Sequence, residues 1–243
     1  MSIKPDFSFV IPSYNESQYI ERTLKQFLPF RKEHNFEVIV VDGHSTDNTV
    51  ALAKKYVDKV IVEERKTTIA NARNLGAYAA RSNIIIEMDA EVLYSSIPDL
   101  FKEIKKTFAN QKIVAATVKF YIYPSETLLK DKIMDRIVNA LIYLGLKLHL
   151  GIAKGECQIF RKESFIKIGG YDEKIAVSED CALFGKFWQI GKIALLPGIK
   201  VYHSPRRFRK EGYLKLIFKY WVWNWIYMTV TKKSFYHTWK VIR

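Results

Sequence analysis

The feature that most constrains the fold is a regular alternation of short apolar runs with longer runs of helical spacing in the first third of the chain. Strands that are buried on both faces read as continuous apolar runs, and a helix between two such strands lets them pair in parallel. The pattern predicts an α/β fold with a mostly parallel sheet, covered by helices on both faces. Ser45 or Thr46 is expected to cap the second helix. The expected strands are 7–12, 36–42, 59–64 and 83–90, and the expected helices are 16–30, 45–56 and 68–80.

The rest of the chain continues this architecture without an internal repeat or a linker-like segment. We therefore expect one compact α/β domain over residues 1–205, followed by a basic and aromatic helical segment over residues 206–243. The further elements expected are a helix 97–110, a strand 112–123, a helical stretch 125–150, a strand and a short helix within 156–173, a helix 178–191 and a strand 192–204.

Lys and Arg outnumber Asp and Glu by 39 to 25 in the 243 residues, giving a net charge of +14. Such a chain attracts polyanions, which include nucleic acid, phospholipid surfaces and phosphorylated ligands. Cys157 and Cys181 lack metal-ligand spacing, so we expect free thiols in a reducing compartment. The apolar run near the N-terminus is short and no small-residue cleavage site follows it, so a cytoplasmic location is expected, with the cytoplasmic face of the membrane as a possible site.

The C-terminal segment contains the stretch nearest to a membrane-associated sequence. Residues 213–230 are apolar and rich in Trp and Tyr, but Lys215, Lys219 and Asn224 interrupt them. Aromatic rings and Lys side chains favour the headgroup boundary, so the profile is typical of a helix on a membrane surface rather than one that spans it. A helix packed on the body of the protein is the alternative.

Two carboxylates follow directly after a core strand. Asp89 and Glu91 come after three isoleucines, and one residue separates them. Ligands bind outside the carboxyl ends of strands in open parallel sheets, and two close carboxylates repel each other unless a cation lies between them. Oxygen ligands at this spacing suit Mg²⁺ or Mn²⁺, which bridge a protein carboxylate and a substrate diphosphate. The alternative is a solvated strand end whose acids pair with nearby lysines.

A set of motifs resembles the family 2 glycosyltransferases of the GT-A fold in content, order and spacing. The motifs are "FVIPSYNE", "VIVVDGHSTDNT", "ANARNLGAYAARSNIIIEMDAE", "GGYDE" and "SED", and the resemblance covers about residues 6–205. It implies a Rossmann-like GT-A domain that transfers a sugar from a UDP- or GDP-sugar with inversion, using Mn²⁺ or Mg²⁺. By this likeness Pro12, Tyr14 and Glu16 line the base and ribose pocket, and Asp42 hydrogen-bonds the nucleoside.

The resemblance also implies how the diphosphate and the metal ion are held. Arg73 suits the diphosphate or the ribose. Asp89 and Glu91 take the place of the family's Asp-x-Asp motif. His203 stands where a third metal ligand occurs in several GT-A enzymes, and a surface His whose hydrogen bonds are satisfied is the alternative. Cationic residues after the last strand are expected to clamp the diphosphate or an anionic acceptor, or to meet lipid headgroups; they are Arg206, Arg207 and Arg209.

Catalysis by inversion requires a base that takes the proton of the acceptor hydroxyl. By resemblance Asp180 is that base, and Glu179 positions it or the acceptor. The alternative is that Ser178, Glu179 and Asp180 form an ordinary capped first turn of a helix.

Three other enzyme classes are excluded by absent motifs. The chain has no G-x-x-x-x-G-K-[ST], no G-x-G-x-x-G and no Gly-rich loop with a basic residue after the first strand, so P-loop enzymes, Rossmann dehydrogenases and nucleotidyltransferases do not fit. The non-enzymatic alternative is a basic membrane- or polyanion-binding protein that has the GT-A fold and no donor site. No nucleic-acid partner is expected, because the strands are apolar throughout rather than interleaved with aromatic and basic residues. The C-terminal segment and the amphipathic stretch 126–150 suggest an acceptor that is lipid-linked or a saccharide of the cell envelope, with peripheral membrane contact.

Overall fold

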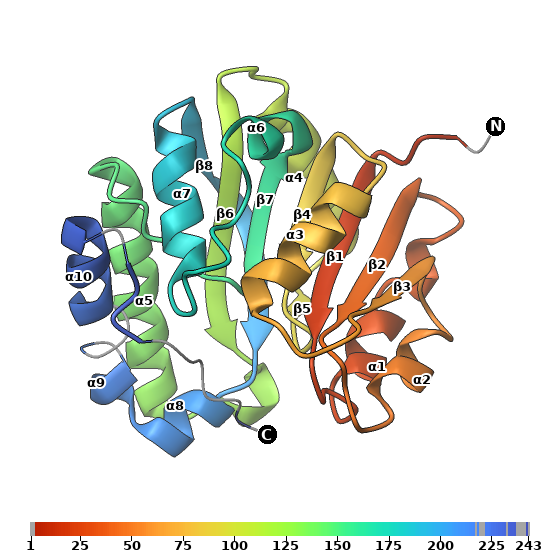
Figure 1. Cartoon of the computed structure of the whole chain (residues 1–243), viewed down its shortest axis with the longest axis horizontal. Helices are drawn as coiled ribbons and strands as arrows, with labels where there is room; N and C mark the ends of the chain where they lie inside the picture. Colours follow the sequence, from red (N-terminus) through yellow and green to blue (C-terminus); the bar gives the residue numbers. More distant parts are fainter. Residues whose placement is uncertain (1–2, 217, 219–221, 232, 237–241, 243) are drawn as a thin grey trace.

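The computed structural model describes residues 3–216, 218, 222–231, 233–236 and 242. The strands form one mixed sheet in the order β3-β2-β1-β4-β7-β6-β8-β5 (Figure 1). They are β1 (Phe7–Ser13), β2 (Phe36–Asp42), β3 (Lys59–Val62), β4 (Ile84–Met88), β5 (Leu93–Tyr94), β6 (Ile113–Ile122), β7 (Cys157–Arg161) and β8 (Lys192–His203).

Helices follow most of the strands along the chain. In the first two thirds they are α1 (Ile20–Lys25), α2 (Thr49–Ala53), α3 (Ile69–Ala79), α4 (Ile97–Phe108), α5 (Leu129–Lys147) and α6 (Lys162–Lys167). Further along they are α7 (Glu179–Trp188), α8 (Arg206–Glu211), α9 (Tyr213–Leu216) and α10 (Asn224–Thr231). The predicted fold class, a mostly parallel α/β sheet flanked by helices with a helical C-terminal region, is confirmed.

The direction of β7 decides what lies at the edge of the sheet. β1 pairs in parallel with β2 and β4, and β6 pairs in parallel with β8. β7 lies between β4 and β6 and runs antiparallel to both, with Cys157 opposite Met88. The start of β7 therefore meets the end of β4, and the residues just before β7 join the edge where the parallel strands finish.

Side chains of β1 show how the two helical layers are held. Phe7 and Phe9 contact Phe101 of α4, with ring centroids 4.7 and 5.9 Å apart. Val10, on the opposite face, meets α3 at Gly76, where an added Cβ would lie 2.2 Å from Val10 Cγ1. Since successive side chains of a strand point to opposite faces, α3 and α4 cover the two sides of the sheet. The core fills both interfaces.

The first predicted helix, 16–30, is interrupted. α1 ends at Lys25, and a 3₁₀ turn over Leu28–Phe30 follows it. Pro29 has no N–H to donate to the carbonyl of Lys25 and its ring would clash there, so the α-helix cannot continue.

The predicted cap of the second helix is wrong. α2 begins after Asn48, not at Ser45 or Thr46. The Ser45 backbone N–H and hydroxyl donate to Asp42 at 2.7 and 2.6 Å, and the Thr46 N–H donates to Asn15 at 2.8 Å. Both candidate caps hold the loop after β2 instead.

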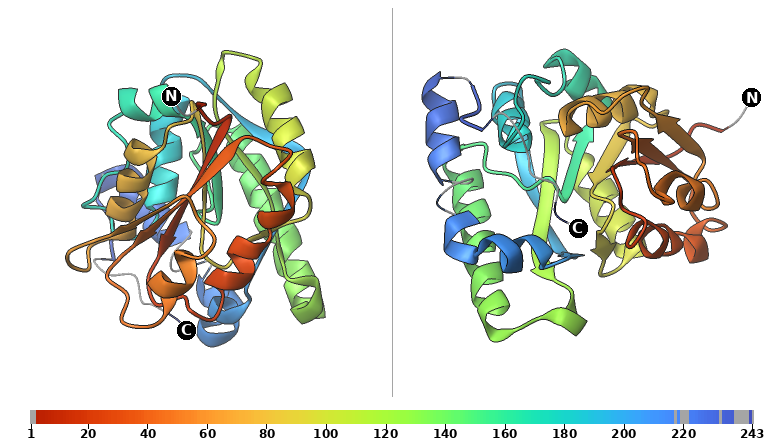
Figure 2. Two further views of the ribbon diagram at one scale, coloured as in Figure 1. Left: turned by 90° about the vertical axis from the view of Figure 1, so that its right-hand side faces the viewer. Right: turned by 60° about the horizontal axis from the view of Figure 1, so that its bottom comes forward.

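The described part of the C-terminal segment both packs on the body of the protein and exposes apolar side chains. The Arg209 guanidinium of α8 lies 3.2 Å from Asp131 of α5, and Asn224 of α10 donates to the Val177 carbonyl at 3.1 Å. Figure 1 and the right-hand view of Figure 2 show α8, α9 and α10 on the side of the molecule where α5 lies. Trp223 is 54% exposed and Val230 is 78% exposed. The domain boundary at residue 205 stays a prediction. Lys219, one of the three polar residues that interrupt the apolar stretch 213–230, lies outside the described residues.

Within the described residues, we find no helix whose length and hydropathy would let it cross a bilayer.

Candidate active site

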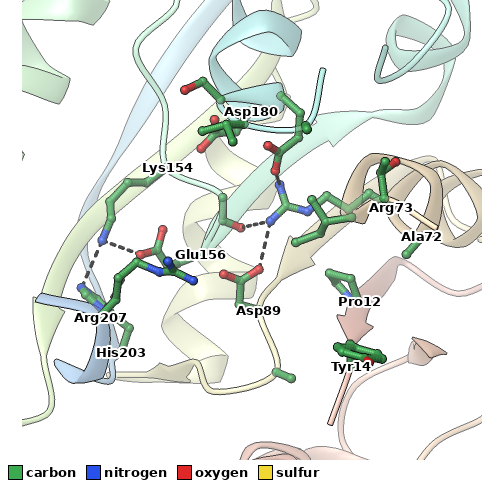
Figure 3. A pocket seen from close by; sticks show the side chains of 18 of the residues that line it. Pro12, Tyr14, Ala72, Arg73, Asp89, Lys154, Glu156, Asp180, His203 and Arg207 are labelled. Carbon is green, nitrogen blue, oxygen red and sulfur yellow. Dashed lines mark hydrogen bonds and ion pairs between the residues drawn. The ribbon is translucent and has the colours of Figure 1, made fainter. Parts of the chain in front are cut away.

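A cavity of about 650 Å³ opens at the edge of the sheet where the parallel strands end and β7 begins (Figure 3). Nearly all of the site residues predicted from the sequence line it, although they come from strands, helices and loops far apart in the chain. Those residues are Pro12, Tyr14, Glu16, Arg73, Asp89, Glu91, Glu179, Asp180, His203, Arg206 and Arg207. Asp42 and Arg209 do not line the cavity.

One wall of the cavity suits a nucleoside. Pro12 is the last residue but one of the buried strand β1, and Tyr14 follows the strand, with the ammonium of Lys66 4.2 Å from the Tyr14 ring centroid. Gly43 and Glu63 line the same region. An aromatic face beside a cation offers stacking for a base and charge for a phosphate.

Asp42 is fully buried and holds the loop rather than the cavity. One carboxylate oxygen accepts from the Ser45 N–H, and the other accepts from the hydroxyls of Ser13 and Ser45 at 2.9 and 2.6 Å. These bonds fasten the ends of β1 and β2 together. The nucleoside contact predicted for Asp42 stays a prediction that requires this network to open.

Arg73 connects the two halves of the site. Its Nη2 lies 2.9 Å from Asp89 Oδ1 and 3.1 Å from the Gly155 carbonyl, and its Nη1 lies 3.3 Å from Glu179 Oε1. The side chain is only 1% exposed. Burial alone would lower its pKa, but Tyr171 and the carboxylates Asp89 and Glu179 raise it well above the ordinary value. A permanently charged guanidinium therefore links the end of β4 to the start of α7.

The predicted metal set is not assembled as a group. In the described part of the chain no three acidic, His or Cys side chains gather closely enough to share an ion. His203 Nε2 lies 3.1 Å from the Lys154 ammonium, and its Nδ1 lies 3.1 Å from the Ser204 carbonyl. Both ring nitrogens are thus engaged, and burial followed by the charge of Lys154 holds the His203 pKa well below its usual range. His203 does not fit a third ligand in this arrangement.

Asp89 and Glu91 fit a cation better than His203 does. The Asp89 side chain is 32% exposed to the cavity. Glu91 Oε2 is buried without a hydrogen bond, although it lies 2.8 Å from an Arg206 guanidinium nitrogen. Burial raises the pKa of Glu91 to about 8, and Arg206 opposes that rise. A buried carboxylate oxygen with an ion pair but no hydrogen bond is a donor that a divalent cation could use.

The two arginines of α8 differ in their partners. Arg206 reaches across the cavity and donates to both carboxylate oxygens of Glu16, at 2.9 and 3.1 Å. Arg207 pairs with Glu211 one turn later in the same helix, at 3.0 Å. Glu16 therefore acts here as the anchor of Arg206, in addition to lining the cavity.

Asp180 and Glu179 open α7 at the far side of the cavity. Burial raises the pKa of both carboxyl groups, and Arg73 opposes the rise. Asp180 Oδ1 accepts from the Cys181 N–H at 2.8 Å. Ser178 has φ 65° and makes no cap, and its hydroxyl instead accepts from Asn224 at 2.9 Å. The alternative of an ordinary capped turn does not describe this helix start.

Sequence reasoning missed a buried cluster beside these groups. The ammonium of Lys154 lies 2.6 Å from Glu156 and 3.1 Å from His203, and Lys154 is 5% exposed (Figure 3). Lys154 and Glu156 directly precede the apolar strand β7 in the sequence. They could have been predicted as site residues only if β7 had been expected to begin at the edge of the sheet where the parallel strands end.

The acidic and basic residues after β3 were also missed. Glu63 and Lys66 follow the third parallel strand in the run "VEERK", at the same kind of strand end that drew attention to Asp89. The rule that ligands meet the carboxyl ends of parallel strands would have found them.

Comparison with known proteins now identifies the family. The family described as "Glycosyl transferase family 2" matches residues 8–169, which is more than half of the chain. The chain belongs to glycosyltransferase family 2. The predicted family is therefore confirmed, and the matched range includes the strand ends that carry Tyr14, Asp89 and Glu156.

Two curated relatives of this family 2 chain match most of its length. The O-antigen chain rhamnosyltransferase WbaN of Salmonella anatum is 26% identical over 82% of this chain and 66% of its own length. The succinoglycan biosynthesis protein ExoA of Rhizobium meliloti (strain 1021) is 27% identical over 81% of this chain and 62% of its own length. The family 2 chain thus spans somewhat less than two thirds of these proteins.

Solved structures share the fold. The mannosyltransferase PcManGT from Pyrobaculum calidifontis, in complex with GDP-Man and Mn²⁺, superposes with a TM-score of 0.65 at 20% identity, over 87% of this chain and 59% of that one. S. aureus TarS 1-349 in complex with UDP-GlcNAc superposes with a TM-score of 0.63 at 17% identity, over 82% of this chain and 58% of that one. At these identities the likeness supports the GT-A fold.

Proposed function

We propose that this chain is the catalytic domain of a glycosyltransferase that moves a sugar from a nucleotide diphosphate sugar to a hydroxyl or phosphate acceptor, with inversion. The observation that carries the proposal is one cavity lined by the Asp89–Glu91 pair at the end of β4 and the Glu179–Asp180 pair at the start of α7. Arg73 bridges the pairs. One cavity thereby offers a donor side and a base.

The donor side is expected to use Pro12 and Tyr14 against the base, with Lys66 and Arg73 near the phosphates. A divalent cation, Mn²⁺ or Mg²⁺, would be held by Asp89 and Glu91, and it would supply charge neutralisation for the diphosphate. Arg206 must then turn from Glu91 toward the diphosphate, a role that its planar guanidinium suits. Complexes of structural neighbours with GDP-Man and Mn²⁺ or with UDP-GlcNAc support a donor of this class.

In the proposed reaction Asp180 takes the proton of the acceptor hydroxyl as its oxygen bonds to the anomeric carbon. The bond from the anomeric carbon to the diphosphate breaks, and the nucleoside diphosphate leaves. A single displacement from the face opposite the leaving group inverts the configuration at that carbon. Glu179 and Arg73 fix the position of α7 relative to the donor side.

The acceptor is proposed to be a saccharide or lipid-linked glycan of the cell envelope, reached from the cytoplasmic face of the membrane by peripheral contact. The names of WbaN and ExoA support a polysaccharide product. The net charge of +14 supports attraction to an anionic membrane.

Donor binding tests the proposal directly. UDP- and GDP-sugars are titrated with and without Mn²⁺ against the wild type and Asp89→Ala, and thermal unfolding is followed. At one hundred times the dissociation constant a ligand stabilises by about 2.7 kcal/mol, which raises the midpoint by a few degrees. We expect one nucleotide to stabilise the wild type with metal and to lose that effect in Asp89→Ala.

The matched control is Glu33→Ala, which removes an exposed carboxylate from the loop between α1 and β2. Nucleotide sugars should stabilise this variant as they stabilise the wild type. If no nucleotide sugar stabilises the wild type, the proposed activity is wrong. The remaining hypothesis is then a basic membrane- or polyanion-binding protein that has the GT-A fold.

A further inference from the structure

We propose that the apolar part of the cavity binds the aliphatic chain of a lipid-linked acceptor. This inference rests on the proposed function and adds a second binding site to it. The site, here called the tail pocket, is formed by apolar side chains from α5, the loop before β7, the loop before α7 and the C-terminal helices. These side chains are Leu141, Ile152, Val177, Leu216, Val222 and Ile226.

The walls of the tail pocket are fixed by close packing. Ile152 lies directly over Gly145 of α5, where an added Cβ would come within 2.7 Å of Ile152 Cβ. Asn224 ties α10 to the Val177 carbonyl at 3.1 Å and is itself fully buried. Leu216 is 4% exposed. Packing contacts therefore hold the part of the wall formed by Ile152, Val177 and Leu216, whereas Val222 and Ile226 are 40% and 45% exposed.

The tail pocket continues into the proposed catalytic end of the same cavity. Val177 precedes Ser178, Glu179 and Asp180 in the chain, and all four line the cavity. A chain seated against Val177 would place the group attached to it beside the proposed base. A pocket for a lipid that takes no part in the reaction would not need to open toward Glu179 and Asp180.

The pocket also continues outward along α5. Ile137, Leu141, Leu144 and Leu148 follow one another at intervals of four, three and four residues, so they share one face of the helix. Leu141 faces the cavity, whereas Ile137, Leu144 and Leu148 are 42%, 50% and 57% exposed. The apolar surface therefore runs from the cavity to the outside of α5. A long chain that leaves the pocket would follow this stripe toward a bilayer.

A wholly polar acceptor would leave the tail pocket without a partner. Sugar hydroxyls need hydrogen-bonding walls, and the six side chains of the pocket offer none. An aliphatic chain gains about fourfold in affinity for each methylene that it buries. Basic side chains accompany the stripe on the same helix, among them Lys130 and Lys147, and they complement the anionic membrane in which such an acceptor resides.

Calorimetric binding of farnesyl phosphate and of inorganic phosphate to the whole chain tests the proposal. We expect farnesyl phosphate to bind at least tenfold more tightly than inorganic phosphate. Leu141→Asn should weaken farnesyl phosphate binding about fivefold or more and leave UDP- or GDP-sugar binding unchanged. Tyr143→Asn is the matched control, because Tyr143 lies on the same helix, is 51% exposed and does not line the cavity; it should change neither affinity.

Val222→Asn provides a second variant in case Leu141→Asn does not fold, since Val222 is already 40% exposed and its replacement costs little stability. Equal binding of farnesyl phosphate and inorganic phosphate would overturn the proposal, as would equal effects of the pocket variants and Tyr143→Asn. Lysophosphatidylcholine that binds as tightly as farnesyl phosphate would show a general lipid groove and refute the acceptor site. If nucleotide sugars fail to bind while farnesyl phosphate binds through Leu141, the proposed function is wrong and the tail pocket stands.

Discussion

At the scale of single residues, the site places carboxylates of different character a few positions apart. Glu87 is fully buried and accepts a hydrogen bond from the Tyr171 hydroxyl, and burial raises its pKa to about 8. Asp89, two residues on, is open to the cavity and pairs with Arg73. The end of β4 accounts for the difference, because Glu87 lies within the strand, whereas Asp89 follows its last residue, Met88, and so meets the edge of the sheet.

The pH dependence of turnover should report Asp180. A base must be ionised to accept a proton, and burial raises the Asp180 pKa above its ordinary 3.8. We expect kcat to fall as the pH decreases, and to do so at a higher pH than an exposed aspartate would give. Asp180→Asn should lower kcat roughly 10²- to 10⁴-fold while leaving donor affinity intact. The check is kcat against pH at saturating donor. A profile that stays flat down to about pH 4 would exclude Asp180 as the base.

Gly155→Ala should disturb the site through Arg73. A Cβ at residue 155 would lie 2.5 Å from Arg73 Nη2, so the guanidinium must leave its place between Asp89 and the Gly155 carbonyl. We expect a loss of about 1–3 kcal/mol in the free energy of unfolding, together with weaker donor binding. Gly185→Ala is the control, because nothing lies within 4 Å of the added Cβ. Matching urea midpoints and donor affinities for the two variants would show that Arg73 does not depend on Gly155.

At the scale of elements, Glu37 joins three segments. It lies on β2, accepts from the Ser8 hydroxyl of β1 and accepts from the Arg81 backbone and guanidinium after α3, at 2.5, 2.6 and 2.7 Å. Burial would raise its pKa, but these hydrogen bonds outweigh burial and lower it below 4.5. The stabilisation is therefore present above about pH 4.5 and is lost as the pH falls through the folded-state pKa.

Glu37→Gln should reduce the free energy of unfolding by about 1–3 kcal/mol at neutral pH, because buried donors lose a charged acceptor. The difference from the wild type should shrink at acidic pH, where Glu37 becomes protonated. Urea unfolding at pH 7 and near pH 4 measures both values. The exposed variant Glu33→Gln is the comparison, and a Glu37→Gln deficit that grows on acidification would contradict the linkage.

The elements also show what the sequence could predict. α3 and β4 were predicted because helical spacing indicates one and three isoleucines form the other; the structure adds that Thr68 caps α3. The direction of β7 could not be predicted, since a buried strand is apolar whether it runs parallel or antiparallel. Lys154 and Glu156 were missed for that reason. Asp89 and Asp180 were found because short motifs carry them, whereas the pairing of Arg206 with Glu16 depends on a contact that no local pattern encodes.

At the scale of the whole molecule, a strongly basic chain exposes apolar side chains along α5 and the C-terminal helices. Leu129 and Ile133 of α5 are 76% and 51% exposed, and the chain carries +14. We expect the protein to sediment with vesicles rich in phosphatidylglycerol at low ionic strength, and to be released as salt screens the attraction. Ile133→Asp should weaken sedimentation, whereas Glu33→Gln, a substitution at an exposed residue outside these helices, should not. Equal binding to neutral vesicles would show that charge does not direct this contact.

The Glu16–Arg206 ion pair joins residues that are 190 positions apart in the chain. On the ribosome, β1 and the Tyr14 wall leave the exit tunnel long before α8 has been synthesised. N-terminal parts of a chain fold first during synthesis, so the wall that contains Tyr14 can form while Arg206 is still missing. A ribosome-bound chain therefore lacks a complete site until translation has passed residue 206. A stop codon between the end of β8 and residue 206 would remove the Glu16–Arg206 ion pair, just as a substitution of Glu16 would.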